Sequence, residues 1–161
     1  MTKRVAIAVA LAALGFSLSA AADDRLVRFE GGIGVIPTGS ANTTTRGVPA
    51  AGQIWHIDRL AADIRTDGRI SVDGRGLLLG AGNNVGRNAG QSVRARLFCN
   101  GTAPLFTDAS SHTSGLVPLE ADGDFRIEDT LSPAVPAECN NSVLLIVNPA
   151  GAWFAAGFQK F

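Results

Sequence analysis

The chain has 161 residues, and its 14 basic and 14 acidic side chains give a formal net charge of zero. Without a basic excess, the chain lacks the electrostatic basis of nucleic-acid binding. Its length suits one domain with one hydrophobic core and leaves little room for a second.

Residues 1–22 have the composition of a bacterial secretory signal peptide. Two basic residues precede an apolar run from Val5 to about Leu18, and small residues then lead to two aspartates. This order predicts cleavage after Ala22, or alternatively after Ala21. The apolar run of about 14 residues is shorter than the roughly 20 that a membrane-spanning helix needs. We therefore expect residues 23–161 to form a single domain in the periplasm or outside the cell.

Short apolar runs alternate with turn signals along the rest of the chain, a pattern typical of β-sandwiches and barrels. We predict strands at about 25–36, 53–65, 69–79, 92–99, 114–120, 124–130, 142–148 and 152–160. Turn residues at 67–68, 121–124 and 148–151 predict hairpins. The run 143–147 does not alternate, which indicates a central strand covered on both faces. Residues 54–64 also fit a helical period, so a helix stays an alternative there.

Cys99 and Cys139 are the two cysteines of the chain. In an exported protein an even number of cysteines predicts a disulfide. If the strands run alternately up and down, both cysteines lie at the same end of the domain. The predicted fold is therefore all-β, an antiparallel, immunoglobulin-like β-sandwich of about eight strands with one disulfide.

Two long loops, 37–52 and 80–91, are candidates for a recognition surface. The second contains Gly80, Gly82 and Gly86, but a strand-like run follows it, where a dinucleotide-binding loop requires a helix. We therefore expect an irregular loop that uses glycine for positive φ. Alternating strands place both loops opposite the disulfide, at the kind of end where sandwiches commonly carry binding loops. The predicted ligand-binding residues are Arg46, Asn83, Asn84, Arg87 and Asn88.

Catalytic and metal-binding residues are sparse. His56 shares a strand face with Asp58, and two such groups do not make a metal site, so we expect a core or cross-strand histidine. His112 lies beside serines and four residues from Asp108, which are triad residue types, but no Gly-x-Ser-x-Gly motif is present. We expect His112 to be a solvated loop residue, and we predict no catalytic residue, metal or cofactor.

These features predict an exported, non-catalytic binding or cell-surface module whose partner is a cell surface, a polar small molecule or a glycan. The C-terminal sequence GAWFAAGFQKF resembles the last strand of bacterial outer-membrane barrels. A small eight-stranded outer-membrane β-barrel is therefore the first alternative. A small secreted hydrolase is the second, and it requires a cleft that unites His56 or His112 with a carboxylate.

Overall fold

The computed structural model describes residues 24–38 and 44–161, and the predicted signal peptide lies outside these ranges. The described part is all-β, and none of it forms a helix long and apolar enough to cross a membrane. Its strands are β1 (Arg25–Gly34), β2 (Trp55–His56), β3 (Arg59–Arg65), β4 (Arg69–Arg75), β5 (Leu78–Leu79), β6 (Ser92–Cys99), β7 (Ser110–Thr113), β8 (Val117–Pro118), β9 (Phe125–Thr130), β10 (Val143–Val147) and β11 (Trp153–Lys160).

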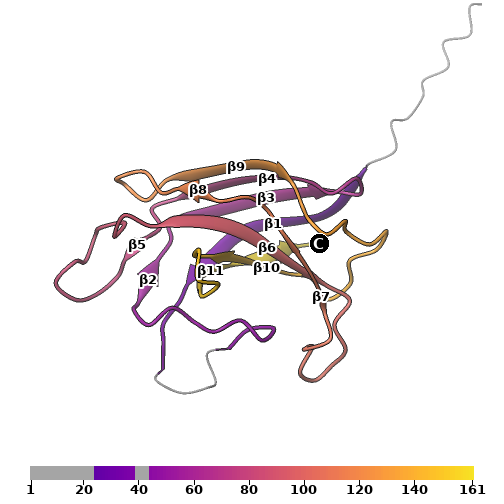
Figure 1. The fold of residues 1–161 in the computed structure, drawn as a ribbon, viewed down its shortest axis with the longest axis horizontal. Coiled ribbons are helices and arrows are strands. Elements are labelled where there is room, and N and C mark those ends of the chain that lie inside the picture. Colours follow the sequence, from indigo (N-terminus) through magenta and orange to yellow (C-terminus); the bar gives the residue numbers. More distant parts are fainter. Residues whose placement is uncertain (1–23, 39–43) are drawn as a thin grey trace, which may run out of the picture.

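The strands form one curled antiparallel sheet in the order β7-β6-β10-β11-β1-β3-β4-β9 (Figure 1). Strand β8 pairs with β6, and β2 and β5 form a separate two-stranded sheet. The curl brings the two edges of the large sheet together. Thr113 at the end of β7 exchanges two backbone hydrogen bonds of 2.8 and 2.9 Å with Ser132, which follows β9. The Gly115 N–H also donates to Asp129 Oδ2 at 2.6 Å.

The inner face of the curl holds the main hydrophobic core. Along β3 and β4 the residues Leu60, Ala62, Ile64, Ile70 and Val72 point inward and are buried. This alternation is what period-two patterning requires of a sheet with one buried face.

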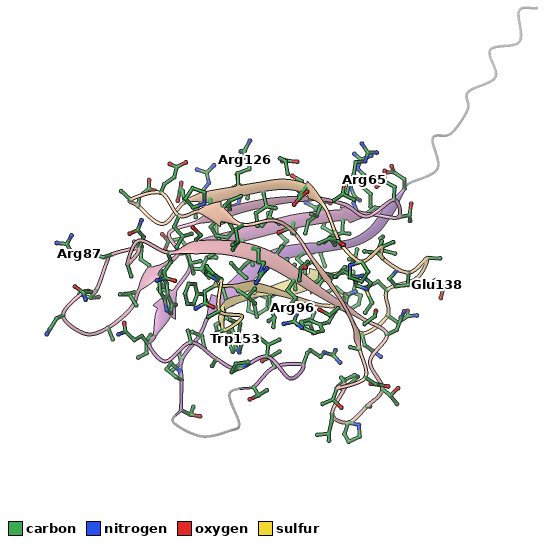
Figure 2. The ribbon with its side chains drawn as sticks, in the orientation of Figure 1. Arg65, Arg87, Arg96, Arg126, Glu138 and Trp153 are labelled. Carbon is green, nitrogen blue, oxygen red and sulfur yellow. A yellow bond between two sulfur atoms is a disulfide. The ribbon has the colours of Figure 1, made fainter. Side chains whose placement is uncertain are left out.

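The outer face of β3, β4 and β9 is charged, and its charges pair with one another. Arg25 contacts Asp63 at 2.9 Å, and Arg75 and Arg126 each contact Asp73 at 3.1 Å. The hydrogen bond from Arg75, and then that from Arg126, lowers the pKa of Asp73. In Figure 2 Arg126 points away from the sheet into solvent.

Strand β10 is covered on both faces, which confirms the prediction for 143–147. Leu144 and Ile146 belong to the main core, whereas Leu145 and Val147 form a second cluster outside the curl with Phe98 and Val48. Val48 belongs to residues 44–51, which we call the strap. Backbone hydrogen bonds of 3.0 Å from Ala51 N to Trp153 O and from Trp153 N to Pro49 O fasten the strap to β11.

Most of the predicted strands are confirmed, with four differences, the first being that only Val117–Pro118 of the predicted strand 114–120 forms a strand, β8. The predicted strand 53–65 is divided into β2 and β3, so no helix forms there, and 69–79 is divided into β4 and β5. The second division falls at Gly76, whose φ is +64° and where a Cβ would collide with Asp58. Strand β7 was not predicted, because its sequence, SSHT, has the polar composition of a loop. The immunoglobulin-like sandwich is not confirmed, since the main strands belong to one continuous sheet.

The predicted disulfide is confirmed. Cys99 ends β6 and bonds to Cys139, with the two Cα atoms 4.7 Å apart. Next to it the Asn100 N–H donates to Asn140 O at 2.8 Å, and the Asn140 N–H donates to Asn100 Oδ1 at 2.9 Å. The disulfide and these hydrogen bonds tie the loop after β6 to the segment before β10.

Replacing both cysteines, Cys99→Ala with Cys139→Ala, should lower the free energy of unfolding by about 4 kcal/mol. The bond closes a loop with a sequence separation of 40 residues, and its loss frees that loop in the unfolded state. Urea unfolding of both proteins measures the difference. Reduction of the wild-type protein is the control and should give a similar loss; equal stability of variant and wild type would contradict the prediction.

Candidate functional site

The five residues predicted to bind a ligand do not share one surface, because Arg46 lies elsewhere. The strap carries it to the disulfide end of the sheet, where its Nη2 donates to Asn141 O at 2.6 Å. Its guanidinium stacks 4.1 Å from the centre of the Phe106 ring, and burial lowers its pKa. The expectation that loops 37–52 and 80–91 meet opposite the disulfide is therefore wrong for the strap, which instead covers the outer face of β10.

Asn88 lies in loop 80–91 and holds that loop to the chain between β8 and β9. Its Nδ2 donates to Leu119 O at 3.1 Å and to Glu120 O at 2.8 Å, and its Oδ1 accepts from Gly90 N at 3.0 Å. Both the nitrogen and the oxygen of the Asn88 side-chain amide are therefore hydrogen-bonded within the protein.

Asn83, Asn84 and Arg87 are exposed on the same loop. Figure 2 shows Arg87 pointing away from the sheet. Gly82 and Gly86 have positive φ values of +81° and +76°, as expected for an irregular loop. The Gly86 N–H donates to Leu79 O at 2.8 Å, so this amide is already committed within the protein.

A hydrophobic groove of about 450 Å³ lies between this loop and the two-stranded sheet. Four exposed aliphatic side chains border it: Ile36 at 60% exposed, Val85 at 59%, Ile33 at 49% and Ile54 at 37%. Single exposed hydrophobic residues are ordinary, so what distinguishes these four is that they gather around one hollow.

Close backbone packing forms the base of the groove. Trp55 N donates to Val35 O at 2.9 Å, and a Cβ at Gly34 would overlap the Trp55 carbonyl. The Trp55 ring lies under the groove and stacks on Phe154, with ring centres 4.0 Å apart and planes at 18°. On the other side of the groove, Gly80 N donates to Ile54 O at 2.9 Å, and this bond joins loop 80–91 to the residues before β2. The groove is thus formed by segments that are hydrogen-bonded to one another.

His56 lies at the groove and not in the core; of the two predicted alternatives, the cross-strand position is the one observed, since His56 pairs with Leu78 of β5. On the short strand β2, Trp55 takes the inward position and His56 the outward one, where 64% of its side chain is exposed. Its Nε2 lies 2.7 Å from Asp58 Oδ1. A carboxylate only accepts hydrogen bonds, so Nε2 carries the proton and the Nδ1 of a neutral ring keeps its lone pair. Within the described part of the chain, Nδ1 has no hydrogen-bond partner.

His112 is buried, which corrects the prediction of a solvated loop histidine. It lies on β7 and is 3% exposed. Its Nδ1 is 2.8 Å from Pro133 O, and its Nε2 is 2.9 Å from Ser110 Oγ. Since the carbonyl can only accept, Nδ1 carries the proton, and Nε2 of the neutral ring accepts from the exposed Ser110, whose Oγ also lies 3.4 Å from Cys99 O.

These placements predict that substitutions of the two arginines change the free energy of unfolding by different amounts. Arg46→Met should lower the free energy of unfolding by about 1–3 kcal/mol, because it removes a charged hydrogen bond and a cation–π contact. Arg87→Met should change it by less than about 0.5 kcal/mol. Asn88→Ala and Asn84→Ala form a second pair with the same expectation. Urea unfolding measures all four, and equal losses within either pair would contradict the assignment.

Comparison with known proteins finds no matching family model, no similar curated protein and no similar solved structure. In the ranges 24–38 and 44–161, no three His, Cys, Asp or Glu side chains converge as a metal site.

Proposed function

We propose that the protein is an exported, disulfide-bonded binding module whose recognition surface is the hydrophobic groove together with loop 80–91. The observation that carries the proposal is the gathering of Ile33, Ile36, Ile54 and Val85 around one preformed hollow. Ligand sites are typically concave, mostly apolar and largely formed before the ligand arrives. The groove has all three properties.

Export is supported by the leader-like residues 1–22 and by the disulfide, which is consistent with an oxidising compartment. Fractionation of the producing cells, followed by gels with and without boiling, should place the protein in the periplasm or the medium. Recovery in the membrane fraction, with a band that shifts on boiling, would overturn this part of the proposal and favour the outer-membrane alternative.

A polar depression adjoins the groove and widens the range of ligands that the surface can bind. Val85 and Gly86 border both hollows, and Arg87 and Asn88 line the polar one. A ligand that reaches across Val85 would meet an apolar wall on one side and polar groups on the other. This arrangement supports a ligand with both kinds of surface.

Ligand-detected NMR against a mixed library of small molecules and oligosaccharides tests the binding site. The double variant Ile36→Lys with Val85→Lys should lose the compounds that bind the wild type, because two charges then border the apolar wall. Leu105→Lys and Leu116→Lys are matched controls, since both leucines are exposed and lie away from the groove. Compounds that bind the double variant and the wild type equally would contradict the proposed surface, as would a library without any binder.

A secreted hydrolase is a second candidate function, favoured by the hydrogen bonds around His112. An exposed serine, a histidine that accepts its hydrogen bond and a group that orients the histidine are the elements of nucleophilic catalysis. Here the orienting group is Pro133 O, where the sequence-based criterion required a carboxylate.

A fluorophosphonate reagent tests this second function. In a hydrolase, Ser110 Oγ would bond to phosphorus, fluoride would leave and His112 would take the proton. Mass spectrometry should then find the adduct on Ser110, with none in Ser110→Ala. Ser111→Ala is the control and should still be labelled, because Ser111 Oγ accepts instead from Arg96 Nε at 2.8 Å. Unlabelled wild-type protein would contradict a catalytic Ser110.

A further inference from the structure

We infer that the groove takes a small, uncharged amphipathic molecule, whose apolar body lies between the aliphatic walls and whose hydroxyl donates a hydrogen bond to His56 Nδ1. The inference rests on the proposed function and adds the chemical class of the ligand and the residue that orients it.

The charge of the groove favours an uncharged ligand. Among the described residues that line it there is no Lys, Arg, Asp or Glu, and His56 is the one titratable residue. The depression on the outer face of β3 and β4 is different, since it is lined by Arg25, Arg65, Arg69 and several carboxylates. An ion placed against the aliphatic walls loses hydration without a counter-charge among the lining residues, and Asp58, the carboxylate beside the groove, is already hydrogen-bonded to His56. A neutral molecule avoids this penalty.

The size of the groove favours a small molecule. Its volume of about 450 Å³ lies within the 300–1,000 Å³ that is usual for small-molecule sites. Glycine at position 80 helps to keep it open, because a Cβ there would lie 2.9 Å from Ile54 Cγ2 and 3.8 Å from His56 Cβ. The apolar wall and the imidazole thus border one continuous space.

The His56–Asp58 pair selects a hydrogen-bond donor. Asp58 Oδ1, 2.7 Å from Nε2, holds the ring in the tautomer whose Nδ1 is an acceptor. A hydroxyl group can donate to that nitrogen, while an ether cannot. Asp58 acts here as a positioning residue, and His56 is the group that would touch the ligand.

Displacement of the fluorescent dye N-phenyl-1-naphthylamine tests the inference. The competitors are 1-decanol, its methyl ether, decanoate and decylammonium, each below its micelle concentration. Decanol should displace the dye from the wild-type protein at about five-fold lower concentration than the ether, the effect of one net hydrogen bond. Both ions should need higher concentrations than decanol.

Variants separate the body of the ligand from its head group. His56→Leu should still bind the dye but should lose the five-fold preference for decanol over the ether. Asp58→Asn should reduce that preference, because an amide does not impose the same tautomer on the ring. Ile36→Lys with Val85→Lys should abolish dye binding, whereas Leu116→Lys should bind it as the wild type does.

Each contrary result has a distinct meaning. Equal displacement by decanol and its ether in the wild type would overturn the role of His56, and stronger displacement by either ion would overturn the uncharged ligand class. If the dye does not bind but library compounds bind the wild type and are lost in Ile36→Lys with Val85→Lys, the ligand class is wrong and the binding function stands. If neither binds, both proposals fail.

Discussion

The structure depends on how one continuous sheet covers its two faces. Curling encloses the inner face, and buried residues from most of its strands fill the interior together with Trp55 and Leu79 of the two-stranded sheet. The outer face is not enclosed by the curl, and its parts differ in how their side chains are accommodated. On the part formed by β3, β4 and β9, the outward side chains are charged and form ion pairs at the surface. The strap covers the part formed by β6 and β10. The groove lies at the end of β1 and just beyond it, where Ile33 and Ile36 stay exposed and neither these ion pairs nor the strap covers them within the described residues.

The closure of the curl also accounts for the contrast between the two histidines. Strand β7 carries His112 to the seam, the line along which β7 meets the residues that follow β9. There the ring is buried and hydrogen-bonded to Pro133 O. Asp129 holds the same seam through hydrogen bonds from Gly115 N and Thr130 N, which lower its pKa. The seam is therefore more stable with an ionised carboxylate, and it weakens as the pH falls through the range in which Asp129 becomes protonated. His56, on a strand of two residues outside the large sheet, has 64% of its side chain exposed.

Local patterns in the sequence were sufficient for elements that depend on local rules. The alternation of Val93, Ala95, Leu97 and Cys99 gives β6 its observed bounds, and Asp67-Gly68 forms the expected hairpin with Gly68 at φ +85°. The curvature of the sheet was not predictable in this way, because one curled sheet and two facing sheets need the same alternation. The groove was missed for a related reason. Ile33, Ile36, Ile54 and Val85 are unremarkable singly, and only the fold brings them together.

A preformed groove changes what its polar group can contribute to binding. Its walls are joined by backbone hydrogen bonds, such as those from Trp55 N to Val35 O and from Gly80 N to Ile54 O, so little of the protein needs to become ordered when a ligand enters. The apolar body of the ligand then provides most of the binding free energy, in proportion to the area that it buries. One hydrogen bond to the exposed His56 adds little to this, because water competes for the same nitrogen. In the proposed complex this hydrogen bond would instead distinguish the two ends of the ligand, so His56 would fix the direction in which the molecule lies while the isoleucines and Val85 hold it.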